Sequence, residues 1–117
     1  MDIEEIRTYC LTKKMVTESL PFGPEVLVFK VLDKIFCLLS LDHPTTLNLK
    51  AEPLQAEEWR AQYPDVVPGY HMNKKHWNTI SLNGSLSNVM ILNMIDHSYH
   101  QVINGMTKKE KEILKEL

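Results

Sequence analysis

Val-Leu-Val-Phe-Lys-Val-Leu-Asp-Lys-Ile-Phe-Cys-Leu-Leu-Ser-Leu, at residues 26–41, is the stretch of this chain that decides the fold. Its two halves, residues 26–31 and 35–41, are rich in the β-branched and aromatic side chains that suit strands. They flank a tight connection at Asp33-Lys34, which is the pattern of an antiparallel hairpin. Residues 45–50 then alternate polar and apolar side chains, as a strand with one solvent-exposed face does. The three segments predict three consecutive antiparallel strands.

The N-terminal part is expected to add a helix and an edge strand. Asp2, followed by Glu5, forms a capping box ahead of apolar residues at helical spacing, which predicts a helix over residues 2–13. Residues 16–20 are predicted to form a short strand. It is closed by Pro-Phe-Gly-Pro at residues 21–24, because prolines cannot donate hydrogen bonds to a neighbouring strand.

The C-terminal half adds helices and one more strand. A proline at a first helical position predicts a short helix over residues 53–63. Residues 77–82 alternate as a strand, and Ser85 is placed to cap a long helix over residues 86–104. A charged C-terminal helix within residues 107–117 has few apolar positions, so it is expected to fray.

This order of elements predicts an α+β fold, with an antiparallel sheet and helices packed on one face. At 117 residues the chain has the length of one domain, so residues 1–117 are expected to share a single core.

Composition and charge exclude several classes of function. The formal net charge is −2, so any binding to nucleic acid must come from a local basic patch. No stretch approaches the ~18 apolar residues of a membrane span, and the acidic start is unlike a secretory signal. The protein is therefore expected in the cytoplasm, away from membranes and as a monomer. Cys10 and Cys37 fit buried positions better than a disulfide.

No arrangement of residues indicates catalysis or a cofactor. His97 and His100 lie three apart in the predicted long helix, but no third ligand stands at a recognised metal-site spacing. No Gly-x-Ser-x-Gly elbow is present, and neither cysteine has a base beside it in sequence. The four glycines are scattered singly at turns and do not form a phosphate-binding loop. The sequence predicts a binding protein without catalytic residues, metal or cofactor.

The strongest candidate site is a basic and aromatic cluster at residues 70–77, within the longest irregular segment of the chain. Its lysines offer charges for phosphates, its amide offers hydrogen bonds and its rings offer stacking surfaces. This composition suits nucleic acid. The candidate contacts are Asn73, Lys74, Lys75, His76 and Trp77. Secondary basic candidates are Lys13, Lys14, Lys30 and Lys50.

Two alternatives fit the same region. In the first, the cluster is structural: Trp77 joins the core, and the lysines keep a loop solvated. In the second, a small ligand or a protein segment binds in a pocket between the loop and the helix at 86–104. Besides Trp77, that pocket would be lined by Tyr70, His71, Ser98 and Tyr99.

Five segments of the chain resemble the YjbR/MmcQ family. The most specific is Pro-Gly-Tyr-His-Met-Asn-Lys-Lys-His-Trp-Asn-Thr at residues 68–79. The others are Pro-Phe-Gly-Pro at 21–24, Val-Phe-Lys-Val at 28–31, Leu-Asn-Leu-Lys at 47–50 and Asp-His-Ser-Tyr at 96–99. The resemblance extends over most of the chain and ends before the C-terminal helix.

The resemblance implies a fold similar to the frataxin-like CyaY topology and a "double wing" mode of DNA binding. In that mode the expected partner would be double-stranded DNA, and its contacts would be the loop residues named above. Frataxin-like proteins bind iron through an acidic ridge on the first helix. The first helix of this chain offers only Asp2, Glu4 and Glu5 and runs into Lys13-Lys14, so iron binding is not expected.

Overall fold

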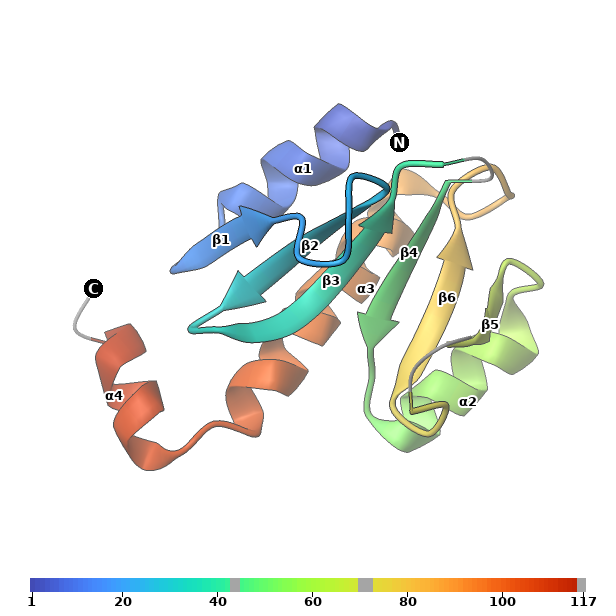
Figure 1. The fold of residues 1–117 in the computed structure, drawn as a ribbon. Helices are drawn as coiled ribbons and strands as arrows, with labels where there is room; N and C mark the ends of the chain where they lie inside the picture. Colours follow the sequence, from blue (N-terminus) through green and yellow to red (C-terminus); the bar gives the residue numbers. More distant parts are fainter. Residues whose placement is uncertain (43–44, 70–72, 116–117) are drawn as a thin grey trace.

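Six strands pair into one antiparallel sheet within residues 1–42, 45–69 and 73–115, the part of the chain that the computed structural model describes (Figure 1). The strand order across the sheet is β1-β2-β3-β4-β6-β5. The strands are β1 (Val16–Ser19), β2 (Val26–Val31), β3 (Lys34–Ser40), β4 (Thr46–Lys50), β5 (Val66–Pro68) and β6 (Trp77–Ser81). The helices of these residues are α1 (Ile3–Leu11), α2 (Pro53–Gln62), α3 (Asn88–Asn104) and α4 (Lys108–Lys115).

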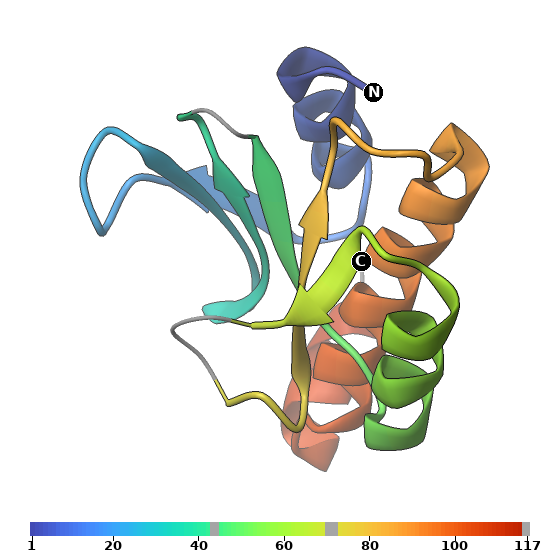
Figure 2. The same ribbon diagram turned by 90° about the vertical axis from the view of Figure 1, so that its right-hand side faces the viewer.

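The four helices lie on the same side of the sheet (Figure 2). Side chains alternate along each strand, so every second residue points toward this helical layer. The sheet contributes Phe29, Leu39 and Leu47 to the core, and the helices contribute Ile6 and Ile95, all of them fully buried. The predicted α+β fold with helices on one face is confirmed.

Helix starts follow the predicted chemistry in α1 but not in α3. The Asp2 carboxylate accepts a hydrogen bond from the Glu5 amide at 2.8 Å, which closes the capping box. The cap of α3 is Ser87, whose hydroxyl accepts from the Met90 amide at 3.1 Å. The predicted cap, Ser85, is wrong because its amide and hydroxyl both donate to the Asp65 carboxylate.

The hairpin turn between β2 and β3 lies one residue earlier than predicted. Leu32 and Asp33 occupy the turn with φ values of +46° and +65°. Two left-handed residues form the tight turn whose twist matches that of the flanking strands, and Lys34 then already belongs to β3. A register shift between Phe29 and Lys30 accompanies the hairpin.

Four further observations complete the description of the fold. β5 pairs with β6 inside the segment that was predicted to be irregular, where a three-residue strand with a proline gives little signal. Leu114 is 7% exposed, so α4 docks through an apolar side chain near its end. Cys10 and Cys37 are buried and free. Among the described helices, none is long and apolar enough to cross a membrane.

Candidate nucleic-acid interface

The residues before β6 form a closed turn that holds two lysines in solvent. The Asn73 side-chain oxygen accepts a hydrogen bond from the Lys75 amide at 2.9 Å. The Asn73 carbonyl accepts from the amides of His76 and Trp77, at 3.2 and 3.0 Å. Lys74 and Lys75 are exposed, whereas His76 and Trp77 are half-buried. The turn therefore fixes the backbone of the cluster and leaves both ammonium groups free to meet a ligand.

Arg60 of α2 anchors this turn to the body of the domain. Its Nε donates to the Asn78 side-chain oxygen at 2.5 Å, and its Nη2 donates to the carbonyls of Lys74 and Trp77. Asn78 is only 1% exposed, and its side-chain NH₂ donates to the Ala56 carbonyl at 3.4 Å. Sequence reasoning missed Arg60. The only available signal was that it is the one basic residue in the otherwise acidic segment Pro53–Gln62.

Gly69 lets the chain pass close to Trp77 on its way from β5 into the loop. The Gly69 amide donates to the Trp77 carbonyl at 2.8 Å. A Cβ atom at Gly69 would lie 2.9 Å from the Cβ of Trp77 and 3.0 Å from its carbonyl oxygen, closer than side chains pack. Glycine is therefore required here by a close approach of two backbones.

The second face of the sheet is covered by no helix of the described residues (Figure 2). We call this surface the open face. Side chains alternate between the two faces along each strand. Those that alternate with the core residues, and that pair with one another across neighbouring strands, therefore belong to the open face. Its central members are Lys30, Leu38, Asn48, Lys50, Val67, Trp77 and Thr79, whereas Val28 on the same side of β2 is fully buried.

The open face has a basic end. Lys50 of β4 pairs directly with Trp77 of β6, so the lysine and the aromatic ring lie side by side where the 73–77 turn enters the sheet. Lys30 of β2 lies toward the same end, opposite Ile35 of β3. Lys50 and Lys30 thus extend the positive charge of Lys74 and Lys75 onto the sheet surface.

The other end of the sheet is acidic. Glu25 precedes β2 and Asp42 follows β3, and a hydrogen bond between their carboxyl groups raises the pKa of Glu25. Leu41 and Glu25 are joined by a backbone hydrogen bond, which holds these two chain ends together. A polyanion would therefore be attracted to the Lys50 end and repelled from the Glu25 end.

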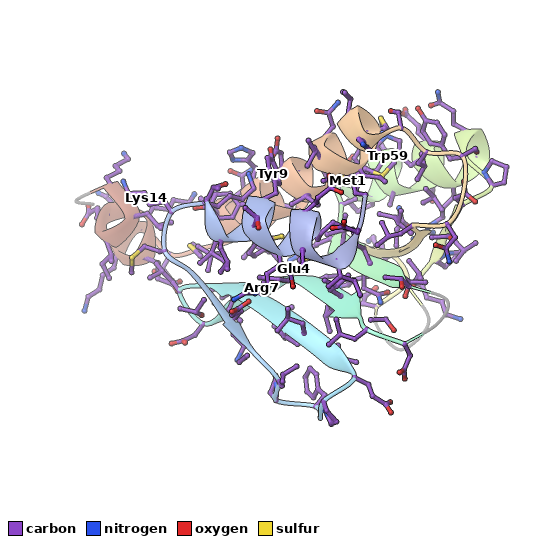
Figure 3. The ribbon with its side chains drawn as sticks, turned by 90° about the horizontal axis from the view of Figure 1, so that it is seen from above. Met1, Glu4, Arg7, Tyr9, Lys14 and Trp59 are labelled. Carbon is purple, nitrogen blue, oxygen red and sulfur yellow. The ribbon has the colours of Figure 1, made fainter. Side chains whose placement is uncertain are left out.

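Lys13 and Lys14 belong to a different part of the molecule. Lys13 forms an ion pair with Asp96 at 2.5 Å and lies over the rings of Tyr9 and Tyr99, at 5.0 and 5.1 Å from their centres. Lys14 is exposed at the end of α1, beside α4 (Figure 3). Of the secondary basic candidates, the structure brings only Lys30 and Lys50 toward the loop.

The segment Asp-His-Ser-Tyr at residues 96–99 ties α3 to its neighbours. Asp96 accepts hydrogen bonds from the Tyr9 hydroxyl at 2.6 Å and from Lys13, both from the N-terminal helix region. Burial disfavours the Asp96 charge, but these two donors outweigh burial and lower its pKa. The same contact raises the pKa of Tyr9 to about 12. His97 accepts from the Glu52 amide at 3.1 Å and packs edge-on against Trp59, with ring centres 5.1 Å apart.

Ser98 and Tyr99 complete this cross-link. The fully buried Ser98 hydroxyl donates to the Phe36 carbonyl at 2.5 Å and accepts from the Lys50 amide at 2.8 Å, so it joins β3 to β4. The Tyr99 hydroxyl donates to the Lys14 carbonyl at 2.7 Å, and its ring packs edge-on against Phe36. The proposed pocket between loop and long helix does not gather these residues, because Ser98 lies under the sheet and Trp77 lies on its open face. Tyr70 and His71 lie outside the described residues.

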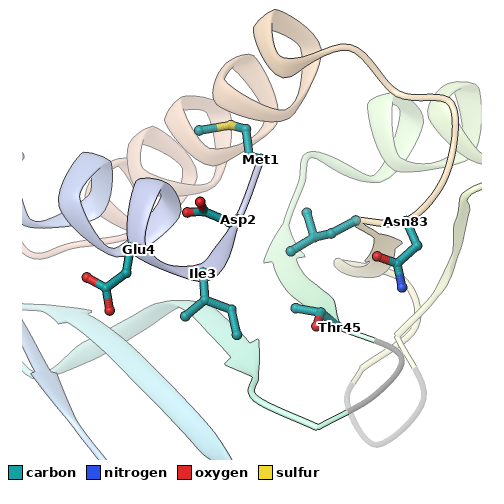
Figure 4. A pocket seen from close by; sticks show the side chains of 7 residues that line it. Met1, Asp2, Ile3, Glu4, Thr45 and Asn83 are labelled. Atoms are coloured by element: carbon teal, nitrogen blue, oxygen red, sulfur yellow. The ribbon is translucent and has the colours of Figure 1, made fainter.

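Three cavities are lined by residues outside the 73–77 turn. One of them, of about 480 Å³, lies between the start of α1 and the connections around β4 and β6 (Figure 4). Its lining includes the carboxylates of Asp2 and Glu4 and no lysine or arginine, so it does not suit a polyanion. In residues 1–42, 45–69 and 73–115, no three histidine, cysteine or acidic side chains gather at a distance suited to a metal ion.

Known proteins are similar to this chain over most or all of its length. A family model described as YjbR matches residues 11–101. The chain is 33% identical over 118 residues to the uncharacterized protein YjbR of Escherichia coli (strain K12), covering 100% of both chains. It is 39% identical over 93 residues to the uncharacterized protein YbdF of Escherichia coli O157:H7, covering 79% of this chain and 76% of that one.

Solved structures of similar proteins have the same fold as this chain. A Deinococcus radiodurans protein with a DUF419 domain has a TM-score of 0.89 and 36% identity, covering 97% of this chain and 87% of that one. A Pseudomonas syringae protein has a TM-score of 0.77 and 27% identity, covering 87% of this chain and 99% of that one.

Proposed function

The chain belongs to the YjbR family, and from its basic, uncovered sheet surface we propose that it is a DNA-binding protein that acts by binding and not by catalysis. The observation that carries this proposal is the grouping of Lys50, Lys74 and Lys75 with Trp77 at one end of the open face. Lysines supply point charges for phosphates, and a half-exposed indole supplies an apolar contact for sugar or base.

The proposed partner is duplex DNA held at the Lys50 end of the open face. The β1–β2 connection projects on the same side of the sheet as the open face (Figure 2). It carries Phe22, whose side chain is 66% exposed, but it ends at Glu25 in the acidic end of the sheet. The proposed contacts therefore do not include this connection.

The expected affinity is modest and depends on salt. Three to four lysines that neutralise phosphates give a slope of log K against log[salt] of about −3. The net charge of −2 opposes binding of the rest of the molecule, so binding should weaken steeply toward physiological salt. We also propose a cytoplasmic location, a reducing compartment in which the buried free thiols of Cys10 and Cys37 would stay reduced.

Fluorescence anisotropy of a labelled, mixed-sequence duplex tests the proposal. Lys74→Gln/Lys75→Gln should weaken binding by at least about tenfold and make the salt slope shallower by about 2. Lys108→Gln/Lys109→Gln is the matched control, because it removes the same charge from exposed positions of α4. Equal losses in the two variants, or no binding by the unmodified protein at low salt, would refute the proposed interface.

A further inference from the structure

A second basic site lies on the helical side of the molecule, apart from the open face. A cavity of about 300 Å³ lies between the residues that follow α1, the last turns of α3 and the C-terminal half of α4. Its apolar wall is Tyr99, Ile103 and Leu114. The other lining side chains are Asn104 and three lysines, Lys14, Lys111 and Lys115.

The three lysines give this cavity a strong positive charge. Lys111 and Lys115 are four residues apart and therefore lie on the same face of α4, where like charges repel each other. Lys14 approaches from another element. None of the three forms an ion pair with the described residues, whereas the neighbouring Lys13 and Lys34 pair with Asp96 and Glu110. Among the residues that the structure describes, no acidic side chain lines the cavity.

The wall of the cavity is fixed in place. The Tyr99 hydroxyl bond to the Lys14 carbonyl holds the turn after α1, in which Met15 adopts a φ of +62°. Tyr99 and Leu114 are each 7% exposed, so the part of their surface that remains open is small. Tyr99 also packs against Phe36 of the core, which prevents its ring from swinging away. A ligand would therefore meet a fixed apolar floor beside three lysine ammonium groups.

From this arrangement we infer that the cavity binds a small phosphate monoester. The phosphate dianion would be held by Lys14, Lys111 and Lys115, which act as point charges and relieve the repulsion along α4. The organic part of the ester would lie against Tyr99, Ile103 and Leu114. A volume of about 300 Å³ is at the lower end of the range for ligand pockets, which limits the ligand to a small molecule.

The site is independent of the proposed DNA contacts, so the two can be tested separately. Phenyl phosphate and inorganic phosphate are titrated into ¹⁵N-labelled protein, and amide shifts are followed by NMR. Phenyl phosphate should give saturable shifts around Lys14, Asn104 and residues 111–115, and it should bind more tightly than inorganic phosphate. Lys74→Gln/Lys75→Gln should leave these shifts unchanged.

Charge variants complete the test. Lys111→Gln/Lys115→Gln should weaken phenyl phosphate binding by at least about tenfold, and Lys14→Gln, on another element, by a few-fold. Lys108→Gln/Lys109→Gln, with the same charge change on the same helix, should bind as the unmodified protein does. Absence of saturable shifts up to about 10 mM, or equal losses in the two double variants, would overturn the site. Equal affinity for the two probes would overturn its assignment to an ester.

Discussion

Replacing Arg60 by methionine should lower the free energy of unfolding by about 2–3 kcal/mol, because the buried side-chain amide of Asn78 loses its hydrogen-bond donor. Asn78 is 1% exposed, and its side-chain oxygen accepts a 2.5 Å hydrogen bond from Arg60. Leaving such a buried acceptor without a partner costs about 1–3 kcal/mol. The carbonyls of Lys74 and Trp77 lose a donor as well, but they can turn to water and add less.

Urea unfolding of the unmodified protein and two variants measures this effect. Arg60→Met alone should show the full loss, which corresponds to a fall in Tm of roughly 10 °C for a domain of this size. Arg60→Met/Asn78→Leu should recover at least about 1 kcal/mol, because an apolar pair needs no hydrogen bond. Hydrogen exchange of the Lys75 and His76 amides should become faster in Arg60→Met. A loss below about 0.5 kcal/mol, or a double variant less stable than Arg60→Met, would refute the anchoring role.

Three other changes probe the scaffold around the interface. Ser98→Ala should cost about 2 kcal/mol in urea unfolding, because it removes the hydroxyl between the Phe36 carbonyl and the Lys50 amide; a cost near zero would contradict this role. Burial, the largest cause, lowers the pKa of His97 below its ordinary 6.5, so stability should fall as pH drops through 6.5 toward the lowered value. His97→Gln should make the dependence of stability on pH flatter over that range. An unchanged pH profile would contradict the assignment of this dependence to His97. Asp33→Gly should raise stability by about 0.5–1 kcal/mol in thermal unfolding, since Asp33 has a φ of +65°, and a loss would show that its side chain matters.

Patterns of apolar residues were sufficient to predict most of the fold. The hairpin of residues 26–41, the long helix and the capping box at Asp2 all depend on local signals that the structure retains. The errors occur where a distant partner decides. Ser85 is a good helix cap in isolation, but it bonds to Asp65, twenty residues away. β5 forms only because β6 offers it a neighbour.

The candidate site was predictable in part. The cluster at residues 73–77 was visible as lysines beside aromatic residues, and Lys50 could be assigned to a solvent-exposed strand position. That Lys50 pairs with Trp77, while Lys13 is occupied by Asp96, depends on strand register and helix packing. Ser98 illustrates the same limit, because a serine in a helix gives no sign in sequence that it links two strands.

The most direct test of the central claim is to map the DNA-contacting surface by NMR. Backbone amide shifts are recorded while a short mixed-sequence duplex, or a matching single strand, is added at low and near-physiological salt. The account predicts shifts confined to the open face and its loop, at Lys30, Lys50, residues 73–77 and Thr79, that shrink as salt rises. No shifts at low salt, or shifts centred on α1 and α3, would contradict it.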